Sequence, residues 1–203
     1  MNQPLLHLPL RSRPVCAIAF ATLLAVACTP LRAQTAGNQP DAALPSPPAT
    51  ASVTLGGGTI DIRYNTPHMR GRKIMGALVP YGQVWRTGAN PATTLITSVP
   101  LVFGTLLVPA GTHTIYSLPS AETWQLIINN QTGQWGLTYN QDRDLGRIPM
   151  KSKPMVTPQE VMSISFEHTT AVSTELHVRW EKTDRYVVIT APQVDSPMSK
   201  VTH

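Results

Sequence analysis

The chain has 203 residues, and its 16 basic and 11 acidic side chains give a formal net charge of +5. Its only cysteines are Cys16 and Cys28, so the chain beyond them holds no disulfide framework, no reactive thiol and no cysteine-ligated zinc. The sparse positive charge is not the clustered basic face that nucleic-acid binding requires, and we expect no nucleic-acid partner.

Residues 1–33 have the layout of a secretory signal peptide. Arg11 and Arg13 precede an uncharged apolar run, residues 15–28, and small residues follow it as far as Ala33. The run is shorter than the roughly 20 residues of a membrane-spanning helix, so we expect no membrane span. We predict cleavage after Ala33 and export to the periplasm or the exterior.

Lipidation at Cys28 is the alternative way of processing the N-terminus. The residues before this cysteine loosely resemble a lipoprotein box, although the leucine stands one place too early. With lipid on Cys28 the protein would be an outer-membrane lipoprotein. Removal of residues 1–33 takes away three arginines and no acidic residue, which lowers the net charge to +2 (16 − 3 − 11).

The rest of the chain divides into a linker, one domain and a tail. Residues 34–50 contain four prolines and only one large apolar residue, Leu44, and this composition predicts an extended tether. Residues 51–192 have the size of a single domain. Residues 193–203 are poor in apolar side chains and are expected to form a flexible tail.

Within the domain, apolar and polar residues alternate with a period of two. In TIDIRY, for example, Ile60, Ile62 and Tyr64 share one face, which predicts a strand with one side in the core. We expect strands over residues 59–64, 93–103, 105–109, 112–118, 123–129, 161–168, 175–180 and 185–191. Many short strands between turn signals predict an all-β fold, an antiparallel sandwich or barrel, with one short helix near 73–81.

Four stretches carry a resemblance to a known family: GRKIMGALVPYGQVWRTGANPATT, LLVPAGTHTIYSLP, WQLIINN and QWG. Through them the chain from Ser52 to Thr190 resembles the bacterial domain-of-unknown-function family numbered 2911, most specifically over residues 79–90. The resemblance implies an exported, compact, β-rich domain and no established activity. In that family the residue after the asparagine is often glutamate, whereas this chain has Pro91, which cannot pair with Arg86.

The segment WRTGAN, residues 85–90 (the WRTGAN loop), is the strongest candidate for a site. Between positions 63 and 86 the chain has no acidic residue and five basic ones: Arg63, Arg70, Arg72, Lys73 and Arg86. One interpretation of this excess is an anion-binding patch. The interpretation that we favour is that Arg86 is buried against Trp85 or a neighbouring aromatic ring, with its donors taken by loop carbonyls or one acid, while the other cations form a solvated face.

The remaining residues of the loop have structural explanations as well. Trp85 either caps the core or stacks on a sugar. Gly88 suits a turn that needs a positive φ, and Pro91 is expected to hold Asn90 in an extended conformation with its amide free to tie the loop.

Other residues with catalytic or ligating chemistry are dispersed. The histidines have no metal-binding spacing, and we expect neither a metal ion nor a cofactor. The alternation places His177 outward with Glu175 and Arg179, and His168 inward at the end of its strand. Asp142 forms an acidic pair with Asp144, which is either a surface turn or an acid and base.

These observations leave three hypotheses for function. The first is a non-catalytic cell-envelope domain that binds an anionic or carbohydrate small molecule, or an envelope protein, beside the WRTGAN loop. The second is a hydrolase or isomerase with dispersed Arg, Asp and His residues, and the third is a structural interaction module. The candidate binding residues are Trp85, Arg86, Asn90, Arg63, Arg72, Asp142 and His168.

Overall fold

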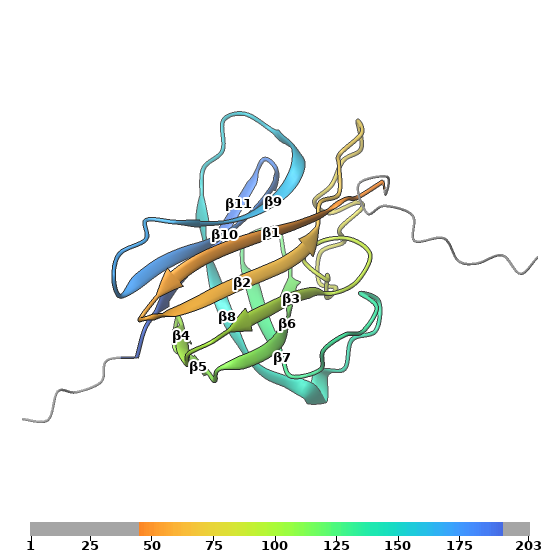
Figure 1. The fold of residues 1–203 in the computed structure, drawn as a ribbon. Coiled ribbons are helices and arrows are strands. Elements are labelled where there is room, and N and C mark those ends of the chain that lie inside the picture. Colours follow the sequence, from red (N-terminus) through yellow and green to blue (C-terminus); the bar gives the residue numbers. More distant parts are fainter. Residues whose placement is uncertain (1–44, 193–203) are drawn as a thin grey trace, which may run out of the picture. The chain divides into compact units, whose positions relative to one another are not determined.

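In the computed structural model, residues 45–192 are described, and they form a strand-rich domain with one 3-10 turn, η2 (Gln141–Arg143) (Figure 1). The expected signal peptide, most of the expected linker and the expected tail lie outside the described residues. The strands are β1 (Pro48–Leu55), β2 (Gly58–Asn65), β3 (Thr93–Thr97), β4 (Leu101–Phe103), β5 (Leu106–Val108), β6 (Gly111–Leu118), β7 (Trp124–Asn129), β8 (Asp144–Lys153), β9 (Gln159–Glu167), β10 (Ser173–Glu181) and β11 (Thr183–Thr190).

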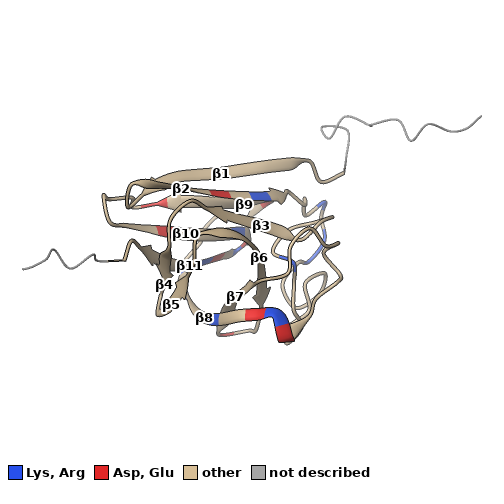
Figure 2. Cartoon of the chain, turned by 60° about the horizontal axis from the view of Figure 1, so that its bottom comes forward, with Lys and Arg blue, Asp and Glu red and all other residues tan. Residues whose placement is uncertain are grey.

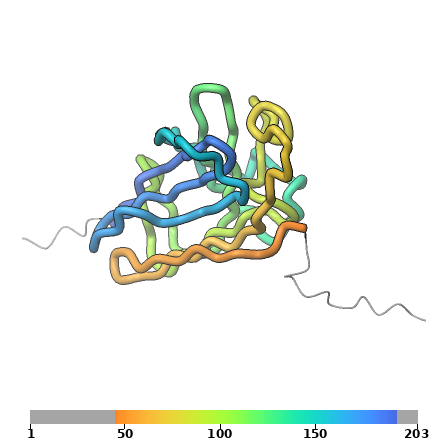
Figure 3. Tube along the Cα trace, turned by 90° about the horizontal axis from the view of Figure 1, so that it is seen from above, coloured from red at the N-terminus to blue at the C-terminus, as the bar shows by residue number. Residues whose placement is uncertain are grey.

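The strands form one antiparallel sheet that curls into a nearly closed barrel. Its order is β1-β2-β3-β6-β7-β8-β11-β10-β9, and β4 pairs with both β5 and β11. Seen from above, β1 runs beside β9, which it contacts (Figure 3). The Tyr64 hydroxyl of β2, the neighbour of the end strand β1, joins the opposite end strand β9 by accepting from Ile164 N (3.0 Å) and donating to Ile164 O (3.3 Å). The predicted all-β, barrel-like fold is confirmed.

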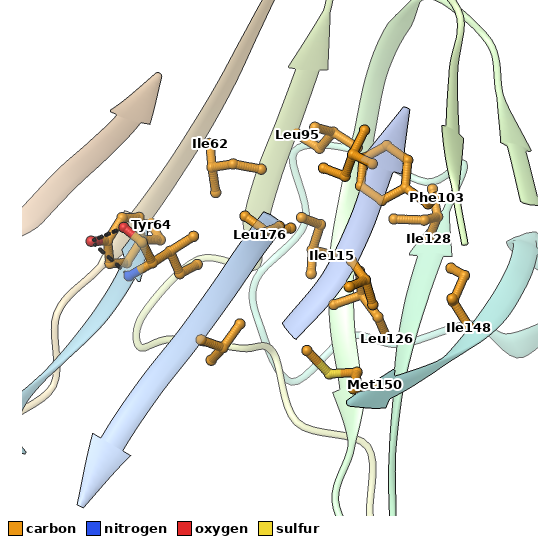
Figure 4. Close-up of a cluster of buried hydrophobic side chains, with 14 of the residues drawn as sticks. Ile62, Tyr64, Leu95, Phe103, Ile115, Leu126, Ile128, Ile148, Met150 and Leu176 are labelled. Atoms are coloured by element: carbon orange, nitrogen blue, oxygen red, sulfur yellow. Dashed lines mark hydrogen bonds between the residues drawn. The ribbon is translucent and has the colours of Figure 1, made fainter. Parts of the chain in front are cut away.

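The core consists of the inward faces of these strands. Figure 4 shows Ile62, Leu95, Ile115, Leu126 and Leu176 converging from separate strands, and all five are buried. Burial alternates along β2, as the sequence pattern predicts for a strand with one face inward. Packing of these side chains fixes the strand register, because a slip of one residue would turn the apolar face outward.

The helix expected near 73–81 is absent from the described residues, and that prediction is wrong. The segment contains consecutive turns, with Gly76 in the left-handed region (φ 77°). The Ile74 and Met75 amides donate to the carboxylate of Glu181 (3.3 and 3.0 Å). Ile74 and Met75 are nevertheless buried. Contacts with Glu181, which is distant in the sequence, therefore hold turns where a short helix was expected.

Several strands differ from the sequence-based expectation. Residues 93–103 form two strands, β3 and β4, which pair with different partners. β8 was not expected, because glycine and proline interrupt its alternation. β1 was not expected as a strand either, and it begins at Pro48, so residues 48–50, assigned to the linker by composition, belong to the sheet. Across residues 45–192 no helix is long and apolar enough to cross a bilayer.

Candidate functional site

The WRTGAN loop leaves the barrel between two neighbouring pairing positions of β6. Trp85 and Ser117 exchange two backbone hydrogen bonds of 2.8 Å each. Thr93 then pairs with Ile115, where β3 begins. Residues 86–92 have no place in the ladder between these positions, so they bulge outward at one end of the barrel (Figure 1).

The left-handed turn of the loop lies at Thr87 (φ 52°) instead of the expected Gly88. This conformation is costly for a β-branched residue, of order 1–3 kcal/mol, and the buried Thr87 hydroxyl is held 2.7 Å from Ser117 Oγ. At position 88 the space is tight, since a Cβ there would lie 3.0 Å from Thr93 Oγ1 and 3.2 Å from Asn65 O.

Asn90 is also left-handed (φ 59°), so the expected extended conformation before Pro91 is wrong. Asparagine is among the few residues that adopt this conformation readily. Its amide does tie the loop, because Nδ2 donates to Ser46 O (3.3 Å). Its carbonyl accepts from Gly136 N (3.2 Å), which joins the loop to the QWG segment.

Trp85 both packs on the core and borders open space. Its ring stacks on Trp180 (centroids 6.0 Å apart, interplanar angle 21°) and meets Trp124 edge to face (6.2 Å, 89°). Its Nε1 donates to Gly88 O (3.1 Å), which fixes the turn of the loop. The indole is therefore held rigidly, with one part available to a neighbouring cavity.

Arg86 is partly buried beneath Gly136. A Cβ on Gly136 would overlap Arg86 Cδ, so only glycine allows this approach. Arg86 Nε is fully buried and has no hydrogen-bond partner within residues 45–192. The expectation that carbonyls or an acid take its donors is wrong for this nitrogen. Burial also holds the pKa of the Arg86 guanidinium below its ordinary value.

A pocket of about 450 Å³ opens beside the WRTGAN loop. Ser46, the loop between β2 and β3, the loop between β7 and β8, and Trp180 of β10 supply its walls. Among the described residues, the lining includes two arginines and two tryptophans, and neither a carboxylate nor an imidazole. Its volume is within the range of small-molecule sites, about 300–1,000 Å³.

Comparison with protein-family models identifies the family of the chain. The model of the DUF2911 family, described as a protein of unknown function, matches residues 46–189. The chain belongs to the DUF2911 family. The resemblance seen in the sequence is confirmed, and the matched range begins at Ser46, a residue of the pocket wall. Comparison with curated proteins and with solved structures gave no match.

The DUF2911 domain brings four of the seven sequence candidates together. Trp85, Arg86, Asn90 and Arg72 line the pocket. Arg72 is held at its rim, because its Nε and Nη2 donate to Met69 O (3.0 Å) and His68 O (2.7 Å). The shared pocket could not be inferred from spacing, since it depends on how β6 and β10 place these loops.

The other three candidates lie outside the pocket lining. Arg63 is exposed on β2, opposite Thr94 of β3. Asp142 is exposed in η2, which agrees with a surface turn. His168 is not on the inward face: its side chain is 64% exposed, with Nε2 3.8 Å from Glu175 Oε2.

Sequence reasoning did not single out three residues that shape the pocket of the DUF2911 domain. Leu78 and Leu137 line it although they are 46% and 78% exposed. Gly136 covers Arg86. The QWG motif was the available signal for Gly136, but its contact with the WRTGAN loop is long-range and leaves no trace in local spacing.

A charged cluster occupies the outer face of β9, β10 and β11, away from the pocket lining. His177 lies there with Glu175 and Arg179 as expected, yet it is fully buried. Its Nδ1 lies 2.7 Å from Asp184 Oδ1 and its Nε2 3.1 Å from Glu175 Oε2, and its ring stacks on Tyr186. Figure 2 shows charged residues spread over several strands and loops. Residues 45–192 contain no group of three or more His, Cys, Asp or Glu arranged to hold a metal ion.

Proposed function

We propose that this DUF2911 domain is a non-catalytic, exported binding domain that holds a small anionic ligand in the pocket beside the WRTGAN loop. The observation that carries the proposal is the buried Arg86 Nε without a partner. A buried donor on a charged group is expensive to leave unpaired. Arg86 also borders the pocket, so an anion there would place a negative charge beside this guanidinium and offset the cost of its buried nitrogen. The terminal nitrogens of a planar guanidinium are suited to bind such an anion through two donors.

The charge of the lining supports an anion over a cation. Arg72 and Arg86 are the charged residues that border the pocket, and no acid among the described residues opposes them there. At the position where the family resemblance implies a glutamate, Pro91 instead makes a bridge with Trp135. Position 91 therefore provides no carboxylate to neutralise the positive charge of Arg86.

The composition of the lining also supports binding over catalysis. General acid–base chemistry needs a titratable side chain within hydrogen-bond reach of the ligand. The two sequence candidates of that kind, Asp142 and His168, do not border the pocket. The presence of a pocket likewise disfavours a purely structural module, for which a flat surface beside the WRTGAN loop is expected.

Export is proposed from the N-terminal sequence, which lies outside the described residues. Residues 1–33 combine a basic flank, an apolar run and small residues before Gln34. Mass spectrometry of the mature protein is expected to show Gln34 as the first residue. A lipidated Cys28 would establish the outer-membrane alternative, and an intact Met1 would refute export.

Thermal melts with added anions test the binding proposal. Phosphate and acetate are titrated at constant ionic strength, and the melting temperature of the unaltered domain is expected to rise. Arg86→Gln should abolish this rise, and Arg86→Lys should reduce it by more than half because lysine lacks the planar fork. Arg63→Gln removes the same charge at an exposed position and should retain the full rise.

The same melts separate binding from a structural role of Arg86. In the absence of added anions, Arg86→Lys is expected to melt within a few degrees of the unaltered protein, since no protein partner of Nε is lost. A large drop without anions would assign Arg86 a structural role. Equal loss of the anion effect in Arg63→Gln would mean general charge screening and would overturn the proposal.

A further inference from the structure

Two leucines give the pocket an apolar mouth. Leu78, from the loop between β2 and β3, and Leu137, from the loop between β7 and β8, both line it. They remain 46% and 78% exposed, and both belong to the few large apolar side chains so exposed within residues 45–192. Exposed apolar side chains that meet at one concave site mark a surface that contacts a ligand.

The interior of the pocket continues this apolar surface with aromatic rings. Trp85 and Trp180 stack on each other and both border the cavity, although Trp180 is only 2% exposed. Val84 and Pro80 also contribute to the wall. A ligand that was only a small inorganic ion would leave these surfaces uncovered.

The cationic part of the pocket suits one negative charge. In Arg72, Nε and Nη2 already donate to the carbonyls of Met69 and His68. Arg86 is the guanidinium with a buried, unpartnered Nε. The paired N–H donors of one guanidinium match a carboxylate, because its two oxygens accept side by side.

Resting on the proposed function, we infer that the ligand is an organic carboxylate with an apolar body. Its carboxylate binds Arg86, and its body lies against Trp85 and extends between Leu78 and Leu137. The volume of about 450 Å³ suits a small organic acid. Acids with aliphatic chains, such as those released from lipids, and acids with an aromatic ring share this chemistry.

Binding of defined acids to the domain tests the inference. Isothermal titration compares acetate, octanoate and 3-phenylpropanoate with octanol, 3-phenylpropanol and inorganic phosphate. Octanoate or 3-phenylpropanoate is expected to bind at least about tenfold more tightly than acetate and phosphate, because each buries several additional methylene or ring carbons. The alcohols should bind at least about tenfold more weakly than their acids. The stronger of the two acids identifies the aliphatic or the aromatic source.

Leu137→Ser supplies the matched test of the apolar mouth. The side chain is 78% exposed, so its replacement should leave the melting temperature unchanged. It is expected to weaken the apolar acid several-fold and to leave acetate and phosphate unaffected. Leu107→Ser, at a 59% exposed leucine of β5 outside the pocket lining, should change none of these affinities.

The outcomes distinguish the inference from the proposed function. If phosphate and acetate bind as tightly as the apolar acids, or if Leu137→Ser leaves the apolar acid unaffected, the inference is overturned and anion binding stands. If the alcohols bind as tightly as their acids, the carboxylate has no role and the inference is overturned. If no anion binds and none shifts the melting temperature, both proposals fail.

Discussion

Gly136 is the residue that sets the position of the Arg86 side chain. It is buried against the arginine stem, and its amide donates to Asn90 O (3.2 Å). A Cβ on it would overlap Arg86 Cδ and would lie 2.7 Å from Asn90 O. The carbonyl belongs to a left-handed residue and has little freedom to move, so the guanidinium stem would have to give way.

Gly136→Ala is therefore expected to lower the free energy of unfolding by about 1–3 kcal/mol, the usual cost of overpacking. It should also reduce the anion-dependent rise in melting temperature, because Arg86 is displaced. Urea denaturation and anion titrations measure both effects. Gly133→Ala is the control: its Cβ meets nothing within 4 Å, so only its backbone (φ 77°) opposes the change, and anion binding should persist.

At the scale of the strands, the outer face of β9, β10 and β11 is held by charge. Arg179 forms a bidentate pair with Glu167 of β9, and its Nε donates to Asp184 Oδ2 of β11 (2.8 Å). Hydrogen bonds from Arg179 lower the pKa of Glu167 from 4.5 to about 2. An acid with a depressed pKa contributes stability that is present above its unfolded pKa and is lost as the pH falls toward the folded value.

Glu167→Gln is expected to destabilise the domain by about 1–2 kcal/mol at neutral pH, a value discounted because the carboxylate is partly solvated. The difference from the unaltered protein should shrink as the pH falls from about 4.5 and should be largely lost near pH 2. Chemical denaturation at several pH values measures it. Glu122→Gln, at an exposed residue, should stay within about 0.5 kcal/mol throughout. A difference at pH 2 as large as that at neutral pH would contradict the assignment to the carboxylate charge.

At the scale of the whole molecule, closure of the barrel depends on contacts between segments that are distant in sequence. The Tyr64 hydroxyl bridges β2 to Ile164 of β9, across 100 positions of the chain. Met162 N of β9 also donates to Pro67 O (2.9 Å), so the loop after β2 lies along the same edge. These bonds satisfy N–H and C=O groups on the side of β9 that does not pair with β10. A buried edge strand needs such partners, because unpaired backbone groups are costly away from water.

Tyr64→Phe is expected to lower the free energy of unfolding by about 1–3 kcal/mol, because it leaves the buried Ile164 amide unpaired without opening a cavity. Urea denaturation measures the loss. Tyr81→Phe, at a 44% exposed ring, should have an effect within about 0.5 kcal/mol. Equal stability of Tyr64→Phe and the unaltered protein would mean that the barrel closes without this bridge.

The sequence by itself determined the all-β class, because alternation of apolar and polar residues in segments such as TIDIRY is a local property that tertiary contacts preserved. It also determined that the WRTGAN loop is a turn-rich stretch between two apolar segments. Only the tertiary structure decided that residues 73–81 form turns instead of a helix, and that Arg72, Arg86 and Asn90 share one pocket while Asp142 and His168 lie elsewhere. The reason is that pairing of Trp85 with β6 and packing of Gly136 on Arg86 join distant segments, and local periodicity carries no information about such contacts.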